Sequence, residues 1–164
     1  MKPPIICIAG KSNSGKTTLL EKLIFELTRR GYKIGSAKHT HDGFDFDKKG
    51  KDSWRHKKAG ATATLVVTDT KIALVKEDTR SYLEKLVTFL GDCDLILAEG
   101  FKKQPLKKIE IFRTDGDHKA PMCLRDPHLI AFVTDGDYRP PVPVFGLNDV
   151  QEIASFIEEN YLTL

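Results

Sequence analysis

The chain has 164 residues, of which 40% are hydrophobic and 30% are charged, and its formal net charge is +3. This length suits one domain with one core, and so small a charge does not by itself indicate a nucleic-acid-binding protein. No apolar run is long enough to span a bilayer, the amino terminus does not resemble a signal peptide, and the 3 distant cysteines favour free thiols over disulfides or zinc. We therefore expect a single cytoplasmic domain over residues 1–164.

The first part of the chain alternates strand and helix patterns. Ile5–Ala9 is a continuous apolar run, which predicts a fully buried strand. Leucines at helical spacing predict a helix over Thr17–Arg30, which Gly31 ends. A second strand is expected over Lys33–Lys38, and the polar segment His39–Lys58 is expected to be mostly loop, with a helix towards its end.

The second part begins with a predicted hairpin, formed by strands Thr62–Thr68 and Lys71–Lys76 around a tight turn. A helix is expected over Thr79–Leu90. The elements predicted after it are strands at Asp94–Ala98, Lys107–Arg113, Leu129–Val133 and Val144–Phe145, and a last helix capped by Asn148 or Asp149 and reaching about Tyr161. This alternation predicts an α/β fold, a mostly parallel sheet flanked by helices, with an added β-hairpin.

The segment GKSNSGKT, Gly10–Thr17, follows the first strand and opens the first helix. It matches the phosphate-loop pattern G-x-x-x-x-G-K-S/T, in which backbone N–H groups and a helix N-terminus surround the phosphates. Lys16 is expected to reach the β- and γ-phosphates, and Thr17 to bind Mg²⁺. The alternative is a glycine-rich turn before a helix. The residues predicted to bind nucleotide here are Gly10, Lys11, Ser12, Asn13, Ser14, Gly15, Lys16, Thr17 and Thr18.

Lys11 adds a second basic residue to this loop. The form G-K-x-x-x-G-K-S/T resembles the loop of dimeric P-loop hydrolases of the signal-recognition and MinD type, in which the extra lysine reaches the nucleotide of the partner subunit. The alternative is a solvated surface lysine, which is common.

Glu99 is the candidate acid. It ends the apolar run that starts at Asp94, and in P-loop proteins an acid at the carboxyl end of a neighbouring strand holds Mg²⁺ or orients water. We predict that Glu99 acts with Lys16 in catalysis and with Thr17 at the metal. Asp94 lies at the opposite end of this strand and is interpreted as a cap or surface acid.

The polar segment that begins at Lys38 is dense in Asp, His and Lys. Asp45 and Asp47 alternate around one residue, so both side chains point the same way if the backbone is extended, and they are predicted to help hold Mg²⁺. The alternative is a solvated loop.

A transition-metal site at His39, His41 and Asp42 is a further alternative in this segment. The spacing of these three residues matches no zinc pattern.

Three sequence segments together point to one family. They are the phosphate loop, KHTHDGFDFDKKGKDS at Lys38–Ser53 followed by AGA at Ala59–Ala61, and DLILAEGFK at Asp94–Lys102. With the closing NDVQEIASFI, the sequence resembles the molybdopterin-guanine dinucleotide biosynthesis protein B family over nearly its whole length. The sequence departs from the family at Gly43, the position directly after Asp42, where the family has an acid. This departure puts only the role of Asp42 in question.

The resemblance implies a homodimeric α/β P-loop protein that binds GTP and Mg²⁺ and hydrolyses GTP weakly. It also implies an adaptor in molybdenum cofactor synthesis, working beside the enzyme that attaches GMP to molybdopterin. Molybdopterin itself and apo-molybdoenzymes are further implied partners, while nucleic acid and membrane are not.

The base that is bound does not follow from the phosphate loop. The Asn-Lys-x-Asp guanine motif is absent, but Asp135 follows the strand Leu129–Val133, where a carboxylate could accept hydrogen bonds from guanine N1–H and the exocyclic amine. A turn acid is the alternative reading of Asp135. Only the resemblance favours GTP over ATP.

Two other functions compete with the adaptor. A small-molecule or nucleotide kinase would use the same loop, but its arginine-bearing lid is not evident in the sequence. The basic run Lys48–Lys58 is a candidate nucleic-acid-binding segment. However, Asp52 interrupts its positive charge, and only Trp54 could stack on a base. For the dimer, we expect the apolar strand pair of Thr62–Lys76 to extend a sheet edge that a second subunit covers.

Overall fold

A computed structural model describes residues 2–40, 43 and 48–162 of the chain. These residues form two compact units, one made of residues 1–39 and 83–164 and the other of residues 40–82. Each unit is described by itself below.

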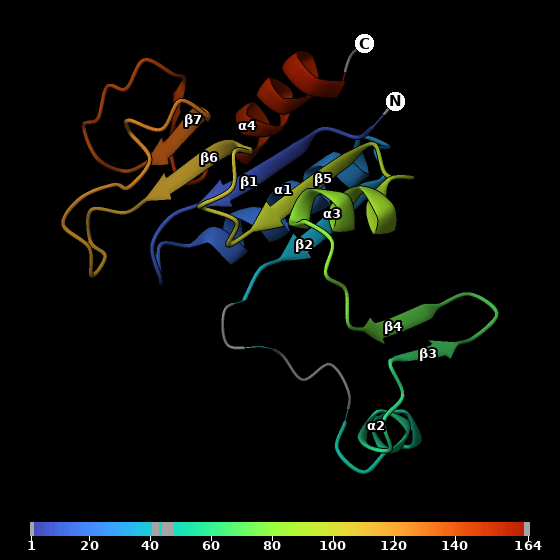
Figure 1. Ribbon diagram of the computed structural model, residues 1–164. Coiled ribbons are helices and arrows are strands. Elements are labelled where there is room, and N and C mark those ends of the chain that lie inside the picture. Colours follow the sequence, from blue (N-terminus) through green and yellow to red (C-terminus); the bar gives the residue numbers. More distant parts are fainter. Residues whose placement is uncertain (1, 41–42, 44–47, 163–164) are drawn as a thin grey trace. The chain divides into compact units, whose positions relative to one another are not determined.

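The larger unit is built on a six-stranded parallel sheet (Figure 1). The strands occur in the spatial order β2-β5-β1-β6-β7-β8, and every neighbouring pair is parallel. Their bounds are β1 Ile5–Ala9, β2 Ile34–Lys38, β5 Leu95–Glu99, β6 Lys107–Phe112, β7 Leu129–Thr134 and β8 Val144–Phe145. The predicted α/β fold with a mostly parallel sheet is confirmed, and β1, which leads into the phosphate loop, lies inside the sheet.

Helices cover both faces of this sheet. On one face, α1 (Lys16–Arg29) and α4 (Val150–Ile157) bury leucine and isoleucine side chains against β1, β5, β6 and β7. On the other face, Leu86 of α3 (Tyr82–Leu90) packs with apolar residues of β1 and β5. Because both faces are covered, the inner strands are apolar on both sides, which explains the continuous rather than alternating runs in the sequence.

One helix starts later than the sequence predicts, and the predicted cap of another makes no cap bond. α3 begins at Tyr82, not at Thr79, because Asp78 Oδ1 accepts a hydrogen bond from the Arg80 backbone N–H at 3.0 Å and holds these residues in a turn. Asp149 occupies the predicted cap position of α4 but makes no side-chain cap bond, since its carboxylate accepts from the Gly146 N–H at 2.7 Å. A single turn of π-helix, Glu158–Leu162, continues α4.

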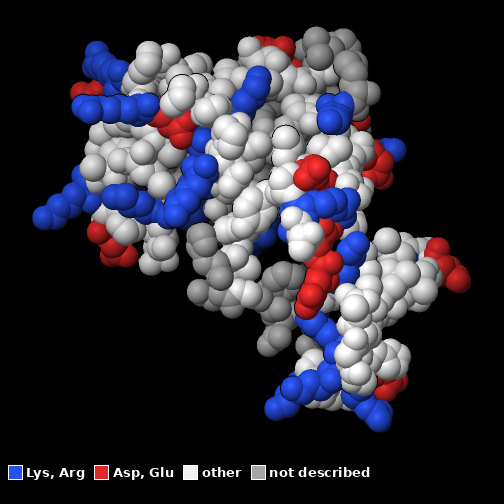
Figure 2. All heavy atoms as spheres, in the orientation of Figure 1, with Lys and Arg blue, Asp and Glu red and all other residues white. Residues whose placement is uncertain are grey.

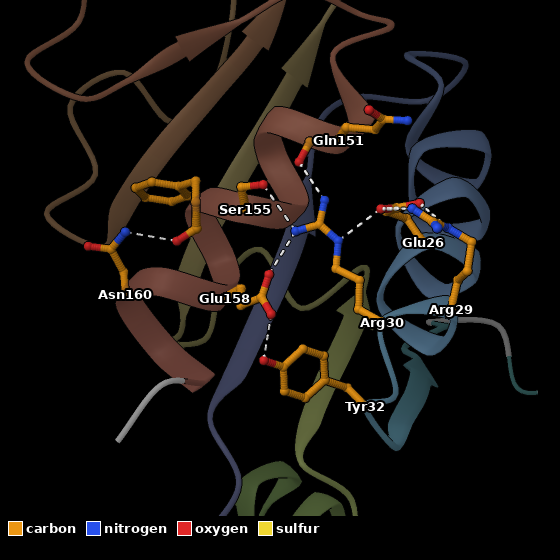
Figure 3. A network of polar contacts seen from close by, with 9 residues as sticks. Glu26, Arg29, Arg30, Tyr32, Gln151, Ser155, Glu158 and Asn160 are labelled. Atoms are coloured by element: carbon orange, nitrogen blue, oxygen red, sulfur yellow. Dashed lines mark hydrogen bonds and ion pairs between the residues drawn. The ribbon is translucent and has the colours of Figure 1, made fainter.

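A polar network fastens the end of α1 to α4 and its continuation (Figure 3). Arg30 donates to Glu26 at 2.8 Å, to Ser155 at 3.0 Å and to Glu158 at 2.8 Å. Tyr32 donates its hydroxyl to the other oxygen of Glu158 at 2.7 Å. Hydrogen bonds from Arg29 and Arg30 lower the pKa of Glu26 to about 2. The network therefore ties the first helix to the last one through charge-assisted hydrogen bonds.

The smaller unit holds a short helix and a hairpin. α2 (Asp52–Lys58) starts close to where the sequence suggested a helix, and β3 (Ala63–Val67) pairs antiparallel with β4 (Ile72–Lys76). The predicted hairpin is confirmed, but the expectation that it extends a sheet edge is wrong, because β3 and β4 form a separate two-stranded sheet.

Candidate nucleotide-binding site

The loop between β1 and α1 requires glycine at both ends. Gly10 has a φ of 145°, and a Cβ atom there would lie 2.6 Å from the backbone oxygen of Ile111 in β6. Gly15, at the N-terminus of α1, has a φ of 92°. Asn13 has a φ of 61° and is the one non-glycine residue with positive φ in the described ranges. The loop thus curls back on itself, and the N-terminus of α1 points into the space that the loop encloses. This is the geometry of an anion-binding loop.

Two polar groups lie inside this curl. The ammonium group of Lys16 donates to the backbone oxygen of Lys11 at 2.5 Å, and partial burial lowers its pKa, while the charge of Glu99 opposes that shift. The Ser14 hydroxyl is buried and has no hydrogen-bond partner within the described part of the chain. A buried hydroxyl without a partner is rare, and a phosphate oxygen would satisfy it.

The Thr17 hydroxyl and Glu99 meet beside the loop. Thr17 Oγ1 donates to the carboxylate of Glu99 at 3.3 Å to Oε1 and 3.2 Å to Oε2. Glu99 ends β5 and is buried, and the Lys38 ammonium lies 4.0 Å from it. A hydroxyl and a carboxylate at one point are the oxygen ligands that Mg²⁺ prefers, and Mg²⁺ usually keeps waters in its other positions. The residues at this point therefore fit the cation.

Gly100 explains how Glu99 is placed. It has a φ of 88°, and a Cβ atom there would lie 2.6 Å from the backbone oxygen of His39. The His39 backbone N–H donates to the backbone oxygen of Glu99 at 2.8 Å, so the carboxyl ends of β2 and β5 are tied together. The His39 ring packs against Phe101, with ring centroids 5.4 Å apart.

Four predicted metal ligands lie outside the described residues. They are His41, Asp42, Asp45 and Asp47. Among residues 2–40, 43 and 48–162, no three His, Cys, Asp or Glu residues gather closely enough to hold a metal ion. The pair Thr17 and Glu99 is thus the part of the predicted magnesium site that the structure brings together.

Asp135 and Lys11 have identifiable surroundings. Asp135 follows β7 and its Oδ1 accepts from the Thr114 backbone N–H at 2.8 Å, so it fastens the chain that leaves β6. Lys11 is half-buried, and its charge acts on Glu110, opposing the rise in that residue's pKa. Asp94 accepts from the Lys33 backbone N–H at 2.7 Å, in agreement with its interpretation as a cap or surface acid.

Glu110 and Lys108 are buried charged residues that the sequence analysis did not single out. Glu110 accepts from the backbone N–H groups of Met122 and Cys123 at 2.6 and 2.8 Å, and burial raises its pKa. Lys108 pairs with Asp126 at 2.9 Å. Both come from the alternating sequence KKIEIF, and this alternation in a strand with two covered faces was the available signal. They hold the connection between β6 and β7 over the sheet, next to the phosphate loop.

Comparison with known proteins gives consistent matches. The sequence profile described as Molybdopterin guanine dinucleotide synthesis protein B matches residues 5–135. The chain is 40% identical over 162 residues to the molybdopterin-guanine dinucleotide biosynthesis adapter protein of Escherichia coli (strain K12), covering 95% of this chain and 92% of that protein. It is 36% identical over 158 residues to the protein of the same name from Haemophilus influenzae, covering 94% and 88%.

Solved structures agree in fold. The crystal structure of Bacillus subtilis MobB superposes with a TM-score of 0.74 at 26% identity, over 98% of both chains.

In the part of the chain that the structure describes, no helix combines the length and the apolar character needed to cross a membrane.

Proposed function

This chain belongs to the molybdopterin-guanine dinucleotide synthesis protein B family, and on that premise we propose that it is a GTP-binding adaptor in molybdopterin-guanine dinucleotide biosynthesis. Its relatives carry the name of adapter proteins in that synthesis. The observation that carries the nucleotide site is the convergence of Lys16, Thr17 and Glu99 at the mouth of a phosphate-type loop. A cation, a hydroxyl and a carboxylate at one point suit a nucleotide with its magnesium ion.

We propose slow, magnesium-dependent GTP hydrolysis at this site. Thr17 and Glu99 would hold Mg²⁺, which would neutralise charge on the phosphates, with Asp45 and Asp47 as further candidates. Lys16 would neutralise charge on the β- and γ-phosphates, and Glu99 would orient water. The buried Ser14 hydroxyl is a further candidate partner for a phosphate oxygen.

The arginines favour an adaptor over a kinase. Kinases commonly close an arginine-bearing lid over the γ-phosphate. Here arginines from several elements are engaged with nearby carboxylates: Arg30 with Glu26, Arg80 with Asp78, Arg113 with Asp115, and Arg139 with Asp137. Slow hydrolysis without an acceptor is the activity that such a site supports.

The proposed partners follow from the adaptor role. They are the enzyme that attaches GMP to molybdopterin, with molybdopterin or apo-molybdoenzymes as further candidates, in the cytoplasm. On the face shown in Figure 2, Lys and Arg are interspersed with Asp and Glu, which does not favour a nucleic-acid surface. We also propose that the chain works as one nucleotide-binding domain over residues 1–164 and as a homodimer.

Calorimetric titration with GTP and ATP in the presence of Mg²⁺ tests the nucleotide site. Lys16→Ala is expected to abolish GTP binding. Lys33→Ala is the matched control, because Lys33 precedes β2 and thus lies at the opposite edge of the sheet from the loop. Unchanged GTP affinity in Lys16→Ala would refute the assignment.

A turnover assay separates the adaptor from the kinase. We expect slow GTP loss that depends on Mg²⁺ and not on an added acceptor, measured with and without the guanylyl-transferring enzyme. Rapid GTP loss that requires a small-molecule acceptor would instead identify a kinase.

A further inference from the structure

A pocket of about 200 Å³ opens beside the phosphate loop, within the larger unit. Gly15, Thr18 and Lys22 line it from the loop and α1, and Ile111, Arg113 and Asn148 line it from β6 and from the segments after β6 and β8. In open parallel sheets, ligands bind at the carboxyl ends of the strands. A nucleotide whose phosphates lie in the loop would therefore have this pocket within reach of its base.

Arg113 offers a fixed flat surface in this pocket. Its guanidinium group donates twice to Asp115, from Nε and Nη2, both at 3.0 Å. This bidentate pairing holds the plane of the group in one orientation. A planar guanidinium stacks well on an aromatic ring, and a purine is such a ring.

Asn148 offers a directional hydrogen bond. The Lys22 ammonium donates to Asn148 Oδ1 at 3.4 Å, and because a lysine has only donors, Oδ1 must be the acceptor of this pair. The amide nitrogen of Asn148 then remains the donor end of the side chain. A donor complements the carbonyl at position 6 of guanine or hypoxanthine, whereas adenine has an amine donor at that position.

From these contacts we infer that the pocket binds the base of the nucleotide, that Arg113 stacks on it, and that Asn148 selects 6-oxopurines over adenine. Lys22 is a positioning residue that keeps the amide of Asn148 in this orientation. Asp135 is not among the residues that line the pocket. The inference rests on the proposed nucleotide binding, but it concerns the base rather than the phosphates.

The test compares four ligands by calorimetry in the presence of Mg²⁺: GTP, ITP, ATP and inorganic tripolyphosphate. The wild-type chain is expected to bind GTP and ITP more tightly than ATP. In Arg113→Ala, loss of stacking should weaken all three nucleotides by about two- to fivefold and leave tripolyphosphate unchanged. In Asn148→Ala, GTP and ITP should weaken by about three- to tenfold and ATP should change little.

Two controls and a second variant complete the design. Arg139→Ala removes an exposed arginine that also pairs with an aspartate two positions away, and Asn160→Ala removes an asparagine that donates within the C-terminal helix, so neither should change binding. Asn148→Asp keeps the side-chain shape while removing the donors, and it should lower the GTP-to-ATP preference even if Asn148→Ala folds poorly.

The outcomes distinguish the base from the phosphates. If GTP binds no better than tripolyphosphate, or if the Arg113 and Asn148 variants keep the wild-type ratios among the four ligands, the base pocket is wrong, whereas phosphate binding that is lost in Lys16→Ala still stands. If the wild-type chain binds neither tripolyphosphate nor any nucleotide, the proposed function fails as well.

Discussion

The Thr17 hydroxyl lies 3.2 and 3.3 Å from the two carboxylate oxygens of Glu99, although 82 positions separate these residues in the chain. The parallel pairing of β1 with β5 creates this contact, because it brings the end of β5 next to the loop that leaves β1. The hydroxyl of a phosphate loop and the acid of a neighbouring strand thus meet where a nucleotide-bound cation is expected.

Replacing Glu99 by Gln is expected to lower both the affinity for Mg²⁺ and the rate of GTP hydrolysis. The amide keeps the size of the side chain but removes its negative charge, so we expect a loss of about 10- to 100-fold in Mg²⁺ affinity or in GTP turnover. Measuring turnover across a Mg²⁺ titration checks this. Glu152→Gln on the exposed side of α4 is the control, and an unchanged titration in Glu99→Gln would argue for a purely structural Glu99.

Replacing Lys11 tests whether one chain forms the complete nucleotide site or two subunits share it. If Lys11 reaches the nucleotide of a partner subunit, Lys11→Ala should lower GTP hydrolysis by about tenfold or more, as removal of a charged group from a phosphoryl-transfer site does, and wild-type turnover should rise with protein concentration. A surface lysine would leave both unchanged. Steady-state turnover at several protein concentrations distinguishes the two.

The β3–β4 hairpin is the surface on which we expect dimerisation. Leu65 and Val67 lie opposite Leu74 and Ile72 in register, so these four share one face, and they are 54%, 64%, 41% and 73% exposed. Exposed apolar patches mark interaction surfaces. The double variant Leu65→Lys with Ile72→Lys should shift the mass measured by light scattering from dimer to monomer, whereas Thr70→Lys in the turn should not. A monomeric wild-type chain would contradict the expectation.

Glu26 should make stability depend on pH in the acid range. Its pKa is lowered from 4.5 to about 2 by hydrogen bonds from Arg29 and Arg30. A lowered pKa stabilises the fold above the unfolded value, and this stabilisation is lost as pH falls from about 4.5 through about 2. The melting temperature of Glu26→Gln should therefore be lower than that of the wild type at pH 7, and the two should converge across that window. Glu21→Gln, an exposed acid on the same helix, should track the wild type.

Asp135 can be assigned by comparing GTP with ITP, which lacks the exocyclic amine. A base-reading carboxylate would favour GTP, and Asp135→Ala would then reduce the GTP-over-ITP ratio by about three- to tenfold. A turn acid would leave the ratio unchanged, while the melting temperature should fall in either case, because the bond to the Thr114 N–H is lost. The GTP-over-ITP ratio, measured by calorimetry on this variant, therefore decides between the two.

The sequence by itself determined the local features, those that depend on residues close together along the chain. The spacing from Gly10 to Thr17 specifies a loop that curls back on itself, since both glycines adopt positive φ and the helix begins directly after Gly15. Apolar runs of different period likewise predicted most strands and helices, and the acid at the end of β5 was recognisable as Glu99. Motif combinations extended this to the family.

Tertiary structure decided what depends on packing between distant segments. Gly10 is required also because the Ile111 backbone of β6 passes against it, and Glu110 and Lys108 are buried because the connection after β6 folds over them. Arg113 and Asn148 belong to no motif, and they come beside Thr18 and Lys22 only because β6 and β8 both end at the same edge of the sheet as the loop. Spacing along the chain encodes local backbone geometry, whereas the neighbours of a side chain follow from the order of strands in the sheet.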